Sequence, residues 1–132
     1  MKYLLDTHTW IWWQLNPDQL SSKVMKLIGN PSKYTELLLS AISPWEFSKF
    51  LEKKRLAISC HPEEWIEAAL EMPKLRLVPL SPLLAYRSTT LPQPFHSDPA
   101  DQIIVSTARA EQATILTKDQ RILAYKAVKS LW

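Results

Sequence analysis

Glycine and cysteine are almost absent from this 132-residue chain, which contains one of each. A single glycine argues against a glycine-rich phosphate-binding loop and against a flexible linker. A single cysteine, Cys60, cannot form an internal disulfide and leaves no cysteine-based zinc site, as expected in a reducing compartment. The sequence therefore argues against a glycine-rich nucleotide site and against a cysteine-based zinc site.

Long apolar runs are also lacking. No stretch is long enough to span a bilayer, and Asp6 interrupts the first apolar segment before it reaches the length of a signal-peptide core. We therefore expect a cytoplasmic protein with no membrane partner. The composition, 46% hydrophobic and 22% charged, is typical of a globular protein, and the length predicts one domain over residues 1–132. The net charge of +3 is compatible with a polyanionic partner but is not diagnostic of one.

Strands and helices are predicted to alternate along the chain. Apolar runs predict strands at 2–5, 36–42, 75–79, 114–117 and 127–132. Amphipathic spacing and capping residues predict helices or helical turns over 9–15, 16–29, 121–125 and from residues 43, 62, 82 and 99. This order predicts an α/β fold of three layers, α/β/α, with a central, mostly parallel sheet.

The segment 96–105, His-Ser-Asp-Pro-Ala-Asp-Gln-Ile-Ile-Val, places two carboxylates at the start of a helix. Asp98 suits the N-cap, Pro99 the first helical position and Asp101 the third. Because Ile104 continues the face that Asp101 begins, a charged residue heads an apolar stripe.

Three further acids follow predicted strands. Asp6 follows the first strand, Glu46 opens the helix after the second, and Asp119 follows the fourth. The carboxyl ends of parallel strands meet at one edge of a sheet, where open α/β proteins bind ligands. We therefore expect Asp6, Glu46, Asp101 and Asp119 to converge on one notch.

Converging carboxylates repel one another unless a cation compensates their charge. With almost only oxygen ligands on offer, Mg²⁺ or Mn²⁺ is the expected ion, held in part through water. Such an ion polarises a phosphoryl oxygen and lowers the pKa of a bound water, which is the chemistry of phosphodiester hydrolysis. The hydroxyls of Thr7, Ser43 and Thr117 stand beside the acids and are candidates for supporting contacts to them.

Helix capping offers a simpler interpretation of some of these residues. Ser43 and Glu46 fit a capping box, and for Ser43 we prefer the cap. Asp98 is explained as well by an N-cap as by a metal ligand. Asp6 and Asp119 each end an apolar strand and have no evident capping role, so they favour a functional site.

Four short motifs span nearly the whole chain. They are Leu-Leu-Asp-Thr-His near the start, Ser-Pro-Trp-Glu at 43–46, the segment 96–105, and Leu-Thr-Lys-Asp at 116–119. In this order and at this chain length they resemble the PIN-domain ribonucleases of the VapC toxin type. The resemblance implies a Mg²⁺- or Mn²⁺-dependent endoribonuclease with a PIN-like parallel sheet. It also implies an RNA substrate, a homodimer, and inhibition by a cognate antitoxin whose tail occupies the acidic groove.

The resemblance also implies roles for individual residues. It gives an acidic quartet for catalysis and metal binding, Asp6, Glu46, Asp101 and Asp119. Asp98 belongs to an Asp-Pro-x-Asp variant of the motif and is a further candidate metal ligand. Gln102 departs from the pattern, because many relatives have a basic residue there, and this predicts the loss of a contact to substrate phosphate or to a neighbouring carboxylate. For His8 and His96, which flank the acids, we favour ordinary hydrogen-bonding roles.

Two other functions remain open on the sequence alone. A catalytically silent α/β protein-binding module would use the same acids as helix caps and surface charges. A Mg-dependent phosphoacceptor signalling domain would need an adjacent acidic pair after the first strand, where Asp6 stands alone. It would also need a lysine after its last functional strand, whereas Lys118 directly precedes Asp119. The metal-dependent ribonuclease is therefore the favoured hypothesis.

Overall fold

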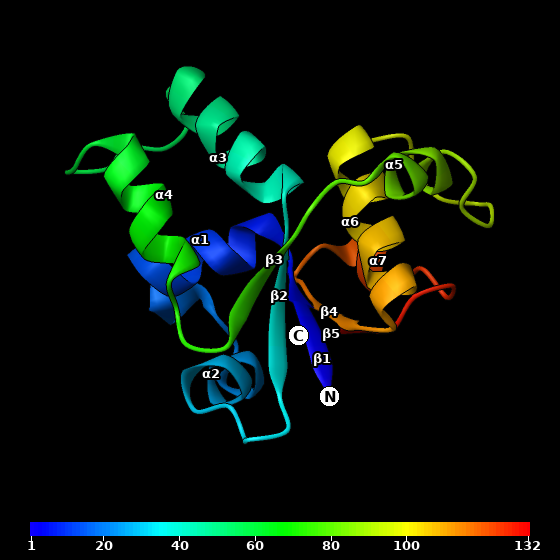
Figure 1. The fold of residues 1–132 in the computed structure, drawn as a ribbon, viewed down its shortest axis with the longest axis horizontal. Helices are drawn as coiled ribbons and strands as arrows, with labels where there is room; N and C mark the ends of the chain where they lie inside the picture. Colours follow the sequence, from blue (N-terminus) through cyan, green and yellow to red (C-terminus); the bar gives the residue numbers. More distant parts are fainter.

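A five-stranded parallel sheet forms the centre of the molecule (Figure 1). The structure is a computed structural model that describes all residues, Met1–Trp132. The strands are β1 (Lys2–Leu5), β2 (Glu36–Ser40), β3 (Leu75–Val78), β4 (Thr114–Leu116) and β5 (Ser130–Leu131). Their spatial order is β3-β2-β1-β4-β5, and all neighbouring strands are parallel. The predicted α/β class with a central parallel sheet is confirmed.

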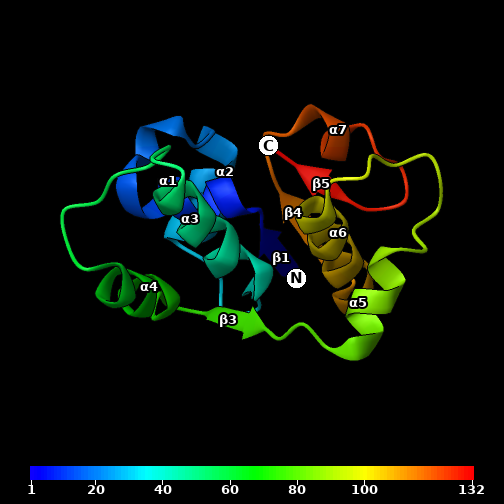
Figure 2. The ribbon, with the colours of Figure 1, turned by 90° about the horizontal axis from the view of Figure 1, so that it is seen from above.

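Helices cover both faces of this sheet, as the view from above shows (Figure 2). One layer contains α1 (Thr7–Leu15), α2 (Ser22–Gly29), α3 (Ile42–Glu52) and α4 (Pro62–Leu70). The other contains α5 (Pro82–Ser88), α6 (Pro99–Glu111) and α7 (Gln120–Leu123). The arrangement has the three α/β/α layers that the alternation of strands and helices predicts.

Alternate strand residues face two separate hydrophobic cores. In β1, Leu5 packs into the core that contains Trp10, whereas Leu4 packs into the core that contains Ile104. Both leucines are fully buried, since successive side chains of a strand point to opposite faces and both faces are covered. A sheet buried on both sides needs apolar residues at successive positions, which explains the uninterrupted Leu37-Leu38-Leu39 run of β2.

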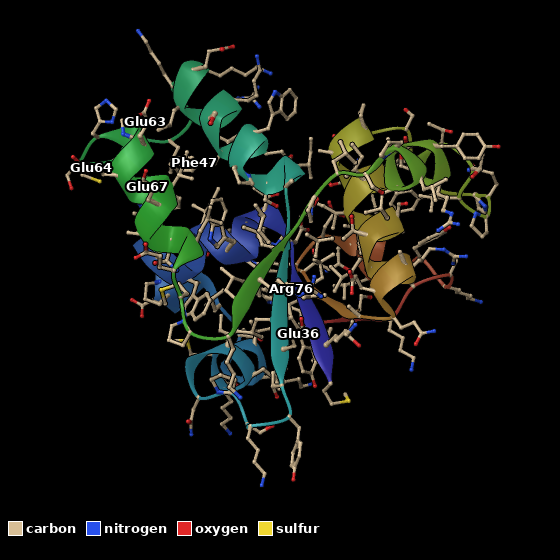
Figure 3. The ribbon with its side chains drawn as sticks, viewed as in Figure 1. Glu36, Phe47, Glu63, Glu64, Glu67 and Arg76 are labelled. Carbon is tan, nitrogen blue, oxygen red and sulfur yellow. The ribbon has the colours of Figure 1, made fainter.

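An aromatic cluster fixes α3 and α4 against α1. Phe47 of α3, labelled in Figure 3, stacks on Trp65 of α4 with ring centroids 4.1 Å apart. Trp10 meets both rings edge-on and donates its indole N–H to the carbonyl of Ala69. Trp10 is fully buried and serves as a core residue.

The helix predicted from Asn16 forms two elements instead of one. A short 3₁₀ turn, η1 (Pro17–Gln19), is followed by Leu20 in an extended conformation, and α2 begins only after it. The cause is local, because the Ser21 hydroxyl accepts a hydrogen bond from the Val24 amide and caps α2. The last strand is also shorter than predicted, since only Ser130–Leu131 pairs with β4.

Surface charges follow the secondary structure. Glu63 and Glu64 lie in the first turn of α4, where the helix dipole favours acids. Arg76 on the edge strand lies beside Glu36 of β2, to which it donates a hydrogen bond (Figure 3). None of the helices combines the length and the apolar character needed to cross a bilayer.

Truncation of a buried leucine of β2 should be costly. Leu38 is fully buried in the core against α6, and Leu38→Ala should lower the free energy of unfolding by about 2–5 kcal/mol. Leu80→Ala is the matched control, because Leu80 is 42% exposed and lies in neither core, so its truncation should change stability by less than about 0.5 kcal/mol. Urea unfolding followed by circular dichroism measures both values, and equal losses would contradict the assignment of Leu38 to the core.

Candidate functional site

Four acidic side chains lie near the carboxyl ends of the central strands. Asp6 follows β1 and Asp119 lies three residues beyond β4. Glu46 stands in the first half of α3, which follows β2, and Asp101 lies in the first turn of α6. We call this set the acidic rim. Its charges act on one another, since Asp6 and Asp101 both raise the pKa of Glu46, and Asp6 and Asp119 both raise the pKa of Asp101.

Asp6 is the most firmly held member of the acidic rim. Its carboxylate accepts a hydrogen bond from the Thr7 amide at 2.8 Å and another from the Thr117 hydroxyl at 2.7 Å. Asp6 is only 4% exposed, so both bonds offset the cost of burying a charge. The Thr7 bond also makes Asp6 the N-cap of α1, and the expectation that Asp6 has no capping role is wrong.

Glu46 is positioned by a chain of hydroxyls. The Thr7 hydroxyl donates to the Glu46 carboxylate, and the Ser43 and Thr7 hydroxyl oxygens are 2.8 Å apart. Because Thr7 has one hydroxyl proton, Ser43 acts as donor to Thr7 when Thr7 donates to Glu46. The predicted capping box of Ser43 and Glu46 is wrong, since α3 begins at Ile42 and has no side-chain cap. Both residues turn instead toward the first turn of α1.

The Asp101 carboxylate is held by His96, and Gln102 in turn holds the segment that carries His96. The His96 Nε2 lies 2.6 Å from the Asp101 carboxylate, and the Gln102 amide donates to the His96 carbonyl at 3.1 Å. Asp98 accepts a hydrogen bond from the Asp101 amide at 3.1 Å and caps α6, as predicted. Gln102 therefore fastens the segment that carries His96, a structural role that the sequence did not suggest.

The two acids of the helices have clearly raised pKa values. Burial raises the pKa of Glu46 to about 7, and the charges of Asp6, Asp101 and Asp98 add to the shift. Burial likewise raises the pKa of Asp101 to about 6, together with the charges of Asp6, Asp98 and Asp119. In each case the hydrogen bond to the carboxylate opposes the shift without cancelling it. The acidic rim is thus electrostatically strained near neutral pH.

Arg121 is a member of the site that the sequence analysis missed. Its guanidinium lies 3.4 Å from the Asp101 carboxylate and 3.2 Å from the Asp119 carboxylate. Partial burial favours a higher pKa for Asp119, but the hydrogen bonds from the Arg121 side chain and backbone outweigh it and lower that pKa. The bond from the Arg121 amide also makes Asp119 the N-cap of α7, so the expectation that Asp119 has no capping role is wrong.

His8 faces Asp6 from the first turn of α1. Its Nε2 accepts a hydrogen bond from the Lys118 amide at 3.0 Å, which places the ring proton of the neutral form on Nδ1. Nδ1 lies 3.5 Å from the Asp6 carboxylate. Burial lowers the pKa of His8 even though Asp6 and Asp119 both favour the charged form. His8 therefore has the hydrogen-bonding role that we favoured for it.

The donor set of the acidic rim suits a hard divalent cation. Its carboxylates and hydroxyls supply only oxygen, and the raised pKa values mark negative charge that a cation would relieve. No three His, Cys, Asp or Glu side chains in the chain form a ready-made group of metal ligands. Mg²⁺ is often bound through one or two carboxylates and several waters, so the residues present fit this ion without a preformed protein cage.

Comparisons with known proteins agree with this architecture. The family description "PIN domain" matches residues 3–128. The chain is 31% identical to Ribonuclease VapC22 of Mycobacterium tuberculosis over 123 residues, which cover 93% of this chain and 91% of that protein.

Two solved structures have the same fold. The structure of DNA-bound VapBC from Salmonella typhimurium matches with a TM-score of 0.67 and 17% identity over 99% of this chain and 97% of that one. VapBC2 from Rickettsia felis, also bound to DNA, matches with a TM-score of 0.64 and 18% identity, covering 99% and 98% of the two chains.

The family match extends over nearly all of the sequence, and the curated relative is similar over the same length. The parallel sheet and the acids at its carboxyl edge lie within the matched residues. The chain belongs to the PIN domain family.

Proposed function

We propose that this chain is a metal-dependent endoribonuclease that hydrolyses RNA phosphodiester bonds and acts as the toxin of a toxin–antitoxin pair. The observation that carries the proposal is the acidic rim, four carboxylates from separate parts of the chain at one edge of a parallel sheet. The similarity to a protein named Ribonuclease VapC22 supports RNA as the substrate class. The whole activity lies in one PIN-like domain over residues 1–132.

The proposed catalytic and metal-binding residues are the four acids of the rim. Asp6 and Asp101 are the firmest candidates for direct contact with Mg²⁺ or Mn²⁺, since both are buried and their charges act on each other. Glu46 and Asp119 complete the set, and Asp98 is a further candidate that also caps α6. When bound, the ion supplies Lewis acidity toward a phosphoryl oxygen and toward the attacking water.

The surrounding residues of the chain keep these carboxylates in place. Thr117 fixes the rotamer of Asp6, and Thr7, backed by Ser43, fixes that of Glu46. His96 holds the Asp101 carboxylate at hydrogen-bond distance. These bonds orient the acids before any ligand arrives, which lowers the reorganisation needed for catalysis.

An antitoxin and a second copy of the chain are the proposed protein partners. The matched structures from Salmonella typhimurium and Rickettsia felis are titled as VapBC, and another from Klebsiella pneumoniae as a toxin–antitoxin complex. A homodimer fits the exposed apolar side chains of α5, where Leu83 is 61% and Tyr86 66% exposed. Large exposed apolar groups of this kind mark interaction surfaces.

The silent binding module is the alternative to be tested. The caps formed by Asp6, Asp98 and Asp119 agree with it, because each acid has a structural role. Glu46 argues against it, since this half-buried acid caps nothing and has a pKa raised to about 7. A protein without a ligand for this charge gains nothing from burying it.

The raised pKa values of Glu46 and Asp101 predict a free energy of unfolding that falls with increasing pH in the absence of divalent ions. The pKa of Glu46 rises from 4.5 to about 7 and that of Asp101 from 3.8 to about 6 on folding. Between these limits the folded chain binds more protons than the unfolded one, so the free energy of unfolding decreases from about pH 4 to about pH 7. Glu46→Gln removes its share of this slope, whereas Glu64→Gln on α4 retains it. Thermal unfolding in EDTA across this range measures the slope, and an unchanged slope in Glu46→Gln would contradict the burial of its charge.

Added Mn²⁺ should stabilise the wild-type protein. Binding to the folded state alone increases the free energy of unfolding by about 2.7 kcal/mol at a hundredfold excess over the dissociation constant. Asp6→Asn and Asp101→Asn should each weaken this response, while Glu64→Gln leaves it intact. Differential scanning calorimetry over a Mn²⁺ titration provides the measurement. A wild-type melting temperature that is independent of Mn²⁺ would rule out the metal site and favour the silent module.

Neutral substitutions in the acidic rim should remove RNA cleavage and leave the fold intact. Asp6→Asn and Asp101→Asn keep the side-chain volume and lower like-charge repulsion, so we expect wild-type circular dichroism. Cleavage should fall by at least about 100-fold, the upper end of what loss of a supporting group around a metal costs. The assay uses total cellular RNA with Mg²⁺ and with EDTA. Wild-type rates in both variants would refute the catalytic assignment.

A further inference from the structure

A hollow of about 1000 Å³ opens beside the acidic rim. Its walls are the segment 92–96, which leads into α6, and Arg121 with the residues 124–127 that follow α7. We call it the Phe95 hollow. Two of its lining residues contact the acidic rim, because His96 lies against Asp101 and Arg121 lies against both Asp101 and Asp119. A molecule in the hollow therefore lies next to the proposed reaction centre.

Phe95 provides an aromatic wall. Its ring centroid lies 4.5 Å from that of Tyr125 and 4.2 Å from that of His96, both in tilted contacts. Tyr125 is 8% exposed and donates its hydroxyl to the Pro92 carbonyl at 2.7 Å, so it supports the wall from behind. Phe95 is only partly buried and lines the hollow, which leaves ring surface for a ligand.

The wall is fixed before any ligand binds. The Gln93 side chain donates to the Leu91 carbonyl and accepts from the Phe95 amide, which closes the proline-rich loop on itself. The Gln102 side chain, on α6, donates a hydrogen bond to the carbonyl of the next residue, His96. Because these bonds already order the loop, little conformational entropy remains to be lost when a ligand binds.

The charged groups of the hollow are cations. Arg121 and Lys126 both line it, and no acidic residue does. The Arg121 side chain is 59% exposed, and its Nη1 makes no hydrogen bond within the chain. Lys126 is exposed and forms no ion pair. The hollow is therefore complementary to a ligand that places one negative group between these cations while another part of it reacts at the acidic rim.

We propose that the Phe95 hollow binds one nucleotide of single-stranded RNA next to the scissile phosphate, with its base on Phe95 and its phosphate between Arg121 and Lys126. This inference rests on the proposed ribonuclease function. Unpaired bases of RNA stack on aromatic side chains, and phosphates pair with arginine and lysine. An acidic protein segment would pair with the cations but would leave the aromatic wall without a planar partner, so RNA is the occupant that uses the whole hollow.

Direct binding measurements test the role of Phe95. The probe is a fluorescein-labelled single-stranded RNA dodecamer of mixed sequence, with Ca²⁺ in place of Mg²⁺, compared with an abasic ribose-phosphate oligomer of the same length. Phe95→Ala should weaken binding of the RNA by about 5- to 150-fold, the range for loss of one stacked base, and should leave binding of the abasic oligomer unchanged. Phe95→Leu keeps apolar packing on Tyr125 but lacks the aromatic face and should behave like Phe95→Ala. Tyr34→Ala is the control, since Tyr34 is 74% exposed and precedes β2 at the opposite end of the sheet, and it should bind both probes as the wild type does.

The lysine is tested with the same two probes. Lys126→Gln should weaken both to a similar degree, because a phosphate contact does not depend on the base, and should reduce the salt dependence of binding by about 0.7 in log–log slope. Lys53→Gln at the end of α3 is the matched control with the same charge change. Melting temperatures of all variants establish that the binding differences do not arise from unfolding.

The outcomes separate this inference from the proposed function. If wild-type protein cleaves RNA in a metal-dependent manner while Phe95→Ala and Phe95→Leu bind and cleave as the wild type does, the hollow is not a nucleotide site and the ribonuclease stands. Equal losses for the RNA and the abasic oligomer in Phe95→Ala would also overturn base stacking. If the wild type neither binds nor cleaves RNA, both proposals fail.

Discussion

The parallel pairing of β1 with both β2 and β4 is the constraint on which the rest of the molecule depends. Leu5, the last residue of β1, is in register with Leu39 of β2 and Leu116 of β4. The three strands therefore end at nearly the same level of the sheet, and this brings the residues that follow them into contact. Thr117 reaches Asp6 for this reason, and Thr7 reaches Ser43 and Glu46. The site is thus a consequence of strand register rather than of any single loop.

This register has an electrostatic cost that the neighbouring side chains reduce. Each acid of the rim is held by a different donor, a hydroxyl for Asp6 and Glu46, an imidazole for Asp101 and a guanidinium for Asp119. The pKa values of Glu46 and Asp101 nevertheless remain raised, because hydrogen bonds offset only part of the effect of burial and like charge. The cationic Phe95 hollow next to this rim gives the surface two adjoining regions of opposite charge. A polyanion whose backbone runs from one region to the other is the ligand that fits this pattern.

The sequence predicted those features that depend on local chemistry. Apolar runs located the strands, and Asp98 was identified as the N-cap of α6 because the Asp-Pro pair has a strong local preference for a helix start. Contacts between distant segments were not predictable. Ser43 was interpreted as a local cap, but its hydroxyl partner is Thr7, 36 residues away. The cap at Asp6 was missed because α1 starts almost directly after β1, and the cap at Asp119 because the helical turn was predicted from residue 121, whereas α7 begins at Gln120. The bond from Gln102 to the His96 carbonyl and the contacts of Arg121 gave no signal, since a polar residue on a helix is usually solvent-exposed.

The position of Arg121 makes this side chain a tethered counterion for Asp101 and Asp119. Any divalent ion that enters the rim competes with a positive group that is covalently attached to the same molecule. The local concentration of such a group does not change on dilution of the protein. Under the proposed function, a metal ion would have to displace this group to occupy the rim, and the folded chain keeps a partly neutralised acidic edge whenever divalent ions are scarce.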